Sequence, residues 1–207
     1  TGVEKVAYIK GAGDNVAKSL RALGVYVENL NAKNITLKKL DLFDAVVIGI
    51  RAFNVDETLS FKNKILWEYA KKGGTLLVQY NTNRGLKTKD LLPFDISISR
   101  DRVTDENSQV KFIHKDHKLL NYPNEITLKD FTGWVQERGL YFPNKWNEKY
   151  IPLFEMNDEG ENAKRGGVLV AKYGKGRIVY TGLSFFRQLP AGVPGAYRLF
   201  FNLIAKK

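Results

Sequence analysis

Few residues in this sequence could act as a catalytic nucleophile. The chain contains no cysteine, which removes thiolate nucleophiles, disulfides and thiolate metal ligands together. Thr82 and Ser184 lie near the ends of expected strands, but bulky residues, Tyr80 and Phe185, stand close to them. A nucleophile elbow needs small flanking residues in a tight strand-to-helix turn. We therefore expect no catalytic triad in this chain.

Both histidines lie in the segment Phe112–Lys118. His114, Asp116 and His117 are close enough in sequence to share a metal ion, so a metal-dependent hydrolase is one alternative. A catalytic zinc site uses three well-placed ligands with further support around them, and this spacing matches no recognised zinc signature. We favour a turn with exposed histidines and expect no metal or other cofactor.

The carboxylates offer a second route to hydrolysis. Glu137 lies between Gln136 and Arg138 and close to Trp134, and an arginine neighbour would keep its carboxylate ionised. We expect a structural ion pair there rather than a catalytic base. The other acidic residues fall into two groups among turn-forming residues, where they usually face solvent: Asp101, Asp105 and Glu106, and Glu155, Asp158, Glu159 and Glu161.

A glycine-rich turn, Gly11-Ala12-Gly13-Asp14-Asn15, joins an expected strand, Val6–Ile9, to an expected helix over 16–23. This layout is that of a phosphate-binding loop, but Val16 fills the third glycine position and no lysine-hydroxyl pair follows. Dinucleotide binding therefore remains an alternative to close packing of the turn, which we favour.

The elements that would position a site form a βαβ unit. Ala45–Ile50 and Thr75–Tyr80 are apolar runs typical of strands buried on both faces. Asp56 is suited to cap the helix between them, and Gly73-Gly74 to end it. Ligand sites in such sheets lie beyond the carboxyl ends of the strands, here near Arg51–Asn54 and Asn81–Arg84.

Regular elements also flank this unit. Tyr26–Leu30 is an expected strand, and Gly167–Tyr173 and Arg177–Thr181 form an expected hairpin that extends the sheet at one edge. A helix over 195–205 follows. The pattern predicts an α/β fold with a mostly parallel sheet, in a single domain over 1–207.

The alternation of strands and helices stops in the segment from about 84 to 161, which contains prolines and polar loops. We expect an irregular insertion there. It carries Trp134 and Trp146. Tryptophans on a loop-rich segment serve as a platform for a sugar or peptide, or cover the open edge of a sheet. Both interpretations stay open, the second being the commoner use.

The composition limits the partners. The 207 residues carry a formal charge of +11, but the basic residues are dispersed among acidic ones, so we expect no nucleic-acid partner. No apolar run approaches the roughly 20 residues of a membrane span. The sequence starts at Thr1 rather than methionine, so we expect an excised domain or a processed product.

Several stretches resemble the class I glutamine amidotransferase-like superfamily, a flavodoxin-like fold that includes trehalose-utilisation-type proteins and the trimerisation domain of some β-galactosidases. The stretches are GAGDN, FDAVVIGIRAFN, KKGGTLLV and AKYGKGRIVYTGLSFF. More narrowly, GWVQERGLYFP with YTGLSFFRQLPAGVPGAYRLFFNLIA is similar to the C-terminal region of bacterial PIG-L (LmbE-like) deacetylases, particularly those of Bacteroidetes. The resemblance implies a flavodoxin-like three-layer sandwich.

The departures from these families remove their chemistry. Gln79-Tyr80-Asn81 stands where active amidotransferases carry the cysteine, and Ser184-Phe185-Phe186 stands where their histidine and glutamate follow a late strand. The A-H-P-D-D-type zinc motif of PIG-L enzymes does not occur. The N-acetylglucosaminyl deacetylase-like activity that the resemblance implies would therefore belong to an N-terminal domain of a longer parent chain.

The resemblance thus implies a non-catalytic accessory domain of a zinc-dependent sugar N-deacetylase, at the periplasm or the cell surface, that binds a carbohydrate or helps assembly. An independent hydrolase and a pure oligomerisation domain, with an apolar patch on Tyr197–Ile204 or the sheet edge, are the alternatives. The candidate ligand-binding residues are Gly11, Asp14, Arg51, Asn54, Tyr80, Asn81, Arg84, Trp134, Glu137, Arg138, Arg187 and Gln188.

Overall fold

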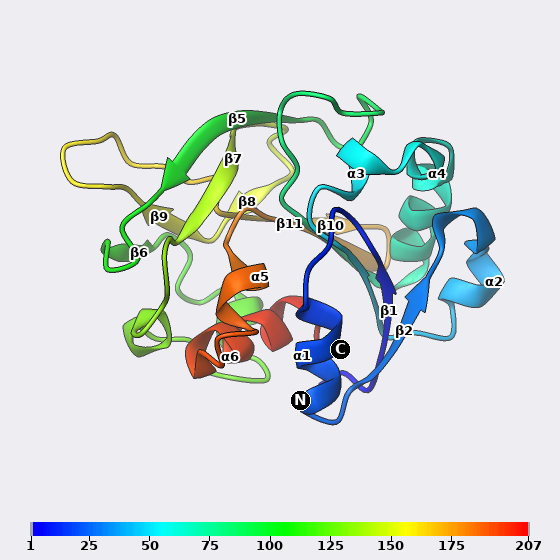
Figure 1. Cartoon of the computed structure of the whole chain (residues 1–207), viewed down its shortest axis with the longest axis horizontal. Helices are drawn as coiled ribbons and strands as arrows, with labels where there is room; N and C mark the ends of the chain where they lie inside the picture. The colour runs from blue at the N-terminus through cyan, green and yellow to red at the C-terminus, as the bar shows by residue number, and fades with distance from the viewer. Residues whose placement is uncertain (1, 207) are drawn as a thin grey trace.

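A central sheet of seven strands organises residues 2–206, which the computed structural model describes. Its strand order is β2-β1-β3-β4-β11-β10-β8, and helices cover both of its faces (Figure 1). The first five strands in this order are parallel, whereas β10 is antiparallel to both β11 and β8. The sheet strands are β1 (Lys5–Ile9), β2 (Tyr26–Leu30), β3 (Ala45–Ile48), β4 (Thr75–Gln79), β8 (Ile151–Pro152), β10 (Val168–Tyr173) and β11 (Gly176–Thr181). The α-helices are α1 (Val16–Ala22), α2 (Leu37–Leu40), α3 (Ala52–Val55), α4 (Glu57–Lys72), α5 (Phe185–Gln188) and α6 (Pro194–Ile204).

Successive side chains of the central strands enter two different cores. Val6 of β1 packs in the core that contains α1 and α6, and Ala7 packs in the core that contains α2 and α4. All four residues of β3 and all five of β4 are buried, because both helix layers require apolar side chains from these strands. The chain therefore has the flavodoxin-like three-layer architecture that the resemblance implied.

The helix of the central βαβ unit begins and ends at the expected residues. The Asp56 side chain accepts a hydrogen bond from the Thr58 amide at 2.8 Å, which caps α4. Gly73 ends the helix with φ of 131°, and a side chain on Gly74 would overlap the ring of Tyr69. The short helix α3, which Arg51 precedes as the N-cap residue, was not expected.

The segment over 84–161 contains more structure than an irregular insertion. It forms two two-stranded antiparallel sheets, β5 with β7 and β6 with β9, while β8 joins the edge of the main sheet. Its elements beyond β8 are β5 (Ile96–Val103), β6 (Val110–Phe112), β7 (Gly139–Trp146), β9 (Phe154–Met156) and the 3-10 helices η2 (Lys118–Leu120) and η3 (Leu128–Phe131).

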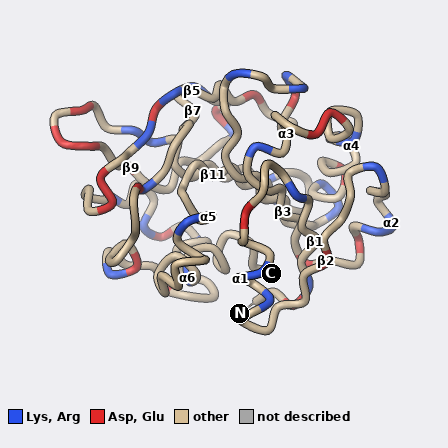
Figure 2. The backbone as a smooth tube through the Cα atoms, viewed as in Figure 1, with Lys and Arg blue, Asp and Glu red and all other residues tan. Residues whose placement is uncertain are grey.

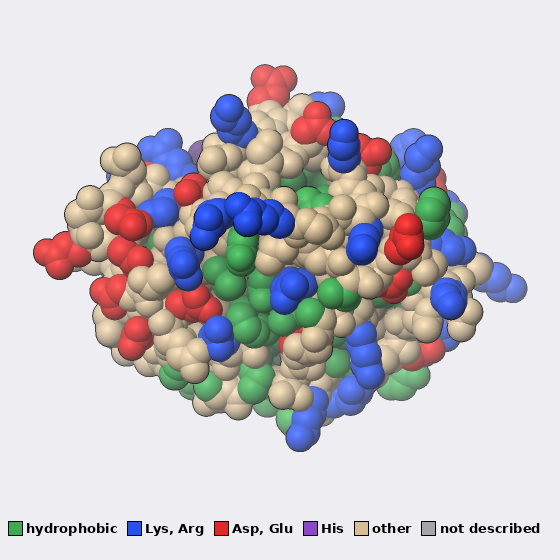
Figure 3. Space-filling view, turned by 45° about the horizontal axis from the view of Figure 1, so that its top comes forward, with side chains coloured by type: hydrophobic (Ala, Val, Ile, Leu, Met, Phe, Trp, Pro, Cys, Tyr) green, Lys and Arg blue, Asp and Glu red, His purple; other side chains and the backbone are tan. Residues whose placement is uncertain are grey.

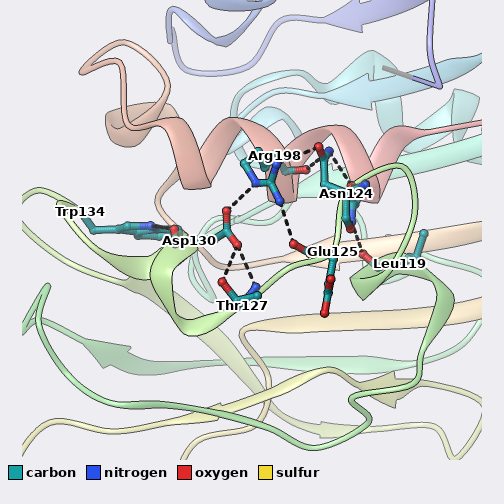
Figure 4. A network of polar contacts seen from close by, with 8 residues as sticks. Leu119, Asn124, Glu125, Thr127, Asp130, Trp134 and Arg198 are labelled. Carbon is teal, nitrogen blue, oxygen red and sulfur yellow. Dashed lines mark hydrogen bonds and ion pairs between the residues drawn. The ribbon is translucent and has the colours of Figure 1, made fainter.

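Polar contacts fix this insertion to α6 (Figure 4). Arg198 donates to an Asp130 carboxylate oxygen at 2.8 Å and to the Glu125 carbonyl at 2.8 Å. The fully buried Asn202 donates to the carbonyls of Leu119 and Asn124. The insertion therefore packs against a helix at the end of the chain.

The closing hairpin extends the parallel part of the sheet on one side, as expected, and the two-residue strand β8 lies beyond it. β11 pairs in parallel with β4, and β10 separates it from the edge strand β8. Beyond it, α6 buries Leu199, Phe200, Leu203 and Ile204 in the core. The apolar face of this helix is thus used within the chain, rather than offered to a second copy. Among the described helices, none is both long and apolar enough to cross a membrane.

Candidate functional site

The carboxyl ends of β1, β3, β4 and β11 lie along one edge of the sheet, toward the top of Figure 1. The loops that follow these strands contain most of the candidate residues. This edge is called the strand-end rim below. Parallel α/β sheets bind their ligands at such a rim, most often where the connections to neighbouring strands diverge.

The connections from β1 and β3 diverge at their carboxyl ends, and there the backbones of the two following loops pack directly against each other. The Ala12 amide donates to the Ile50 carbonyl at 2.8 Å. A Cβ atom on Gly11 would lie 2.0 Å from that same carbonyl oxygen, so only glycine fits there. Gly11 thus permits close approach of two loops, which is the packing interpretation that we favoured over a phosphate loop.

Asp14 places a carboxylate where a bound phosphate would otherwise lie. Its oxygens accept hydrogen bonds from the Tyr8 hydroxyl at 2.6 and 2.7 Å and from the Val16 amide, in the first turn of α1, at 3.0 Å. Burial, followed by the Asp14 charge, raises the pKa of Tyr8, so the phenol keeps its proton and donates. The start of α1 is therefore occupied by an internal anion, which argues against dinucleotide binding.

Gln79 and Asn81 form a buried scaffold at the position expected for an amidotransferase nucleophile. Gln79 donates from Nε2 to the Tyr8 hydroxyl at 3.0 Å. The Asn81 side chain accepts from the Phe53 amide at 3.0 Å and donates to the Gln79 carbonyl at 3.0 Å. Asn81 is fully buried. Its amide group holds the loops after β3 and β4 together and does not face a ligand.

Asn54, in the loop after β3, likewise forms hydrogen bonds with the backbone of the loop after β4. Its side chain donates to the carbonyls of Thr82 and Arg84 and accepts from the Thr82 amide at 2.9 Å. The Arg84 side chain is exposed and takes no part in these bonds, because only its backbone carbonyl is used. Asn54 is thus another scaffold residue.

Three aromatic rings come together beside this scaffold, with Tyr80 only 7% exposed and Tyr141 and Phe186 half-buried. The ring of Tyr80 is stacked on that of Tyr141, with centroids 6.1 Å apart and planes 7° apart, and contacts Phe186 at 5.3 Å. Tyr80, Tyr141 and Phe186 are called the aromatic platform below. Burial raises the pKa of the Tyr80 phenol, so it stays protonated and is able to donate a hydrogen bond. Figure 3 shows a hollow on the upper face where apolar side chains gather among basic ones.

Charged groups border the platform. Arg187 donates from Nε to Glu137 Oε1 at 2.8 Å, and its guanidinium lies 4.9 Å from the centre of the Phe186 ring. The charges of Arg51, Glu137 and Arg187 all act on the pKa of the Tyr80 phenol. The expected ion pair of Glu137 is present, but with Arg187 rather than with its neighbour Arg138.

Strained backbone occurs at two residues that contact Tyr80, namely Arg51 and Tyr141, and at Gln136 in the turn before Glu137. The non-glycine residues with positive φ in the described part of the chain are Arg51, Gln136 and Tyr141, at 54°, 67° and 52°. The Arg51 amide donates to the Tyr80 carbonyl at 2.8 Å. Gln136 is the centre of a three-residue turn closed by a bond from the Glu137 amide to the Val135 carbonyl, a strained conformation for positive φ. Each such residue costs about 1–3 kcal/mol.

Trp134 and Arg138 belong to the core of the insertion instead. The Trp134 ring is 4% exposed, stacks on Phe131 and donates from Nε1 to the Asp130 carbonyl at 2.9 Å. Arg138 donates to the carbonyls of Phe131 and Ser108. Burial lowers the pKa of Arg138 to about 10, which still leaves the guanidinium charged at neutral pH. The side chains of Trp134 and Arg138 thus form their hydrogen bonds within the insertion.

Gln188 and Ser184 set the position of the strained turn. The Gln188 side chain accepts from the Val135 amide at 2.8 Å and donates to the Val135 carbonyl at 2.9 Å. The buried Ser184 hydroxyl donates to the Glu137 carbonyl at 2.7 Å. The backbone on both sides of Gln136 is thus held by side chains from α5 and its cap. Ser184 has no catalytic geometry.

The histidine turn is a structural element. His117 Nδ1 accepts from the Leu119 amide at 3.2 Å and so caps η2. Within residues 2–206, no group of three or more histidine or acidic side chains is arranged to hold a metal ion. Of the acidic residues, Asp158 accepts hydrogen bonds from the backbone amides of Thr104 and Asp105.

Tyr141 and Phe186 are the platform residues that the sequence did not reveal as candidates. Both lie within the stretches that carry the family resemblance, which is the one signal that pointed toward them. Tyr141 comes from β7 in the insertion and Phe186 from α5. Neither spacing nor residue type indicates that these rings meet Tyr80.

Solved structures with similar folds place the chain among known architectures. No protein-family model matches the sequence, and a search of curated proteins found no match. A putative ThuA-like protein from Bacteroides uniformis superposes with a TM-score of 0.59 at 10% identity, over 100% of this chain and 93% of that one. A putative GMP synthase component from Thermoplasma acidophilum gives 0.58 at 13% identity, over 98% of this chain and 92% of that one.

A β-galactosidase from Rahnella superposes with a TM-score of 0.57 at 18% identity, over 97% of this chain but only 31% of the enzyme. Together these structures show that the chain has a glutamine-amidotransferase-like, ThuA-like fold. The same fold is thus found both as most of a chain and as one part of a larger enzyme.

Proposed function

We propose that this chain is a non-catalytic, amidotransferase-like binding domain that recognises a saccharide on the aromatic platform. The observation that carries the proposal is that two residues with positive φ contact Tyr80: the Arg51 amide donates to the Tyr80 carbonyl, and the Tyr141 ring stacks on the Tyr80 ring. Strained backbone of this kind concentrates at functional sites, because the rest of the fold must compensate for its cost. Folding alone gives no reason to retain two such residues beside one ring.

The chemistry of the platform suits a sugar better than a reacting carbonyl. Flat aromatic rings offer an apolar surface to the C–H face of a pyranose, while the Tyr80 hydroxyl, the Glu137 carboxylate and the Arg51 guanidinium are partners for its hydroxyl groups. The positions at the end of β4 hold buried scaffold residues instead of a nucleophile. Binding without hydrolysis follows from that arrangement.

The wider role that we propose is that of an accessory domain of a PIG-L-type sugar N-deacetylase. The sequence stretches over 133–143 and 180–205 support this role, and they include Tyr80's partners Tyr141 and Phe186. The Rahnella β-galactosidase offers a precedent for the architecture, since it contains this fold as about a third of a glycoside-cleaving enzyme. The domain would bring an amino-sugar substrate to a separate catalytic domain.

The test is titration calorimetry with oligomers of glucosamine and N-acetylglucosamine at moderate salt, which suppresses non-specific binding to a basic protein. Tyr141→Ala and Arg51→Ala should each weaken binding about tenfold. Lys18→Ala, an exposed change on α1, is the control and should leave the affinity unchanged. Absence of heat and of thermal stabilisation with every saccharide would overturn the proposal.

A further inference from the structure

A second hollow adjoins the aromatic platform. It has a volume of about 590 Å³ and is lined by β5 and the loop before β10, including Arg100, Arg102 and Lys164. A small hollow of about 50 Å³ lies next to the larger one. The small hollow is lined by Arg100 and Arg102, which also line the larger hollow, and by Leu140 and Tyr141. Tyr141 of the platform thus lines the small hollow, which shares Arg100 and Arg102 with the larger basic hollow.

The arginines of this hollow have no partners within the described residues. Arg100 and Arg102 are exposed and make no side-chain hydrogen bond or ion pair there. Lys164 is different, because its ammonium is paired with Glu161. Asp101 is the other carboxylate of the lining. Within the described residues, the lining thus holds two unpaired guanidinium groups and one unpaired carboxylate, which leaves the hollow with an excess of positive charge.

We propose that this hollow binds the acid group of an anionic carbohydrate whose adjoining ring lies on the aromatic platform. The inference rests on the proposed function and adds the chemical class of the ligand, an oligosaccharide bearing carboxylate or sulfate. Guanidinium groups bind oxyanions such as carboxylate and sulfate through paired N–H donors. Because Arg100 and Arg102 line the same two hollows, they suit one elongated ligand.

The charge pattern favours a saccharide over a nucleic acid. A polyphosphate backbone needs a continuous basic track. Here Asp101, Glu137 and Glu161 interrupt the surface, and Figure 2 shows acidic and basic residues interspersed along the whole chain. Isolated acid groups on an otherwise neutral sugar chain fit this alternation.

The experiment compares three tetrasaccharides by titration calorimetry: oligogalacturonate, its carboxyl-reduced neutral form, and a sulfated chondroitin fragment. We expect at least one acidic ligand to bind about tenfold more tightly than the neutral one. The double variant Arg100→Ala/Arg102→Ala should abolish this preference and leave binding of the neutral ligand unchanged. Lys18→Ala/Lys33→Ala, which removes the same charge from exposed sites elsewhere, should keep the preference.

The outcomes separate the two proposals. Equal binding of acidic and neutral ligands would overturn the inference and leave the saccharide-binding function intact. An acid preference that survives in the arginine double variant would also overturn it. Failure of all saccharides, including the amino-sugar oligomers, would remove both proposals. Tight binding of oligothymidylate that requires Arg100 and Arg102 would overturn the inference in favour of a nucleic-acid partner.

Discussion

The ring of Tyr141 lies parallel to that of Tyr80, with the centroids 6.1 Å apart, although 61 positions separate the two residues in the sequence. Tyr141 reaches this position with φ of 52°. It comes from the insertion, whereas Tyr80 follows the central strand β4. The insertion therefore completes a surface that the parallel sheet alone does not have.

The strain at Tyr141 predicts an inverted order of stability for two substitutions. Tyr141→Ala and Tyr141→Gly both remove the ring, but alanine keeps a Cβ atom at positive φ, where L-residues are disfavoured by about 1–2 kcal/mol. Tyr141→Gly should therefore be the more stable of the two by about 1 kcal/mol, against the usual preference for alanine within a strand. Urea denaturation measures the difference.

The control for Tyr141 is Leu140, the preceding residue of β7, which is absent from the positive-φ set. There Leu140→Ala should be more stable than Leu140→Gly. If Tyr141→Ala equalled or exceeded Tyr141→Gly in stability, the backbone at Tyr141 would not be strained, and the argument for a functional platform would lose its main support.

Asn81 should matter for stability more than for binding. Asn81→Ala leaves the buried Phe53 amide without its acceptor and removes a donor from the Gln79 carbonyl. An orphaned buried polar group costs about 1–3 kcal/mol. We expect a loss of about 2–3 kcal/mol in the free energy of unfolding, measured by chemical denaturation. Arg84→Ala, which removes only an exposed side chain, should change it by less than about 0.5 kcal/mol.

Trp134 tests whether the insertion presents or buries its aromatic residues. Trp134→Phe keeps an aromatic ring near Phe131 but loses the hydrogen bond to the Asp130 carbonyl. The free energy of unfolding should fall by about 1–2 kcal/mol, and the saccharide affinity of the folded variant should not change. A variant of normal stability with weakened saccharide binding would instead make Trp134 part of the binding surface.

The layers of the fold could be predicted because their signals are local. Strands such as β3 are buried on both faces and so are uniformly apolar, and the limits of α4 are set by Asp56 and Gly73. The structure of the insertion was harder to predict, since its short strands pair across long separations. The hydrogen bond from Trp134 to the Asp130 carbonyl joins residues only four positions apart. Even so, the composition of this segment does not tell whether the Trp134 ring is buried or exposed.

The site was only partly predictable. Parallel strands end on one edge, so the rim could be located from β3 and β4 and included Arg51 and Tyr80. The aromatic platform, however, also needs Tyr141 from the insertion and Phe186 from α5, and these rings meet Tyr80 only through the tertiary fold. Asn54 and Asn81 have side-chain amides of a kind that binds ligands, but in the structure these amides form hydrogen bonds with the surrounding backbone.

His117 provides a prediction for pH dependence. Burial, then the positive charges of His114 and Arg177, lowers the pKa of His117 below its ordinary value of 6.5. The folded state thus favours neutral His117, whose Nδ1 accepts the hydrogen bond that caps η2. Because the unfolded chain takes up the proton at higher pH, this contribution to stability is complete above about 6.5. It decreases as the pH falls from there toward the folded-state pKa.

The measurement is urea denaturation of the native protein and of His117→Asn between about pH 7.5 and about pH 5, the range in which histidine titrates. Asparagine keeps a side-chain acceptor for the Leu119 amide but does not titrate. The free energy of unfolding of the native protein, relative to that of the variant, should therefore fall across this range by no more than about 1.4 kcal/mol per pH unit. A constant difference would mean that His117 has the same pKa in the folded and unfolded chains, and its cap would then make no pH-dependent contribution.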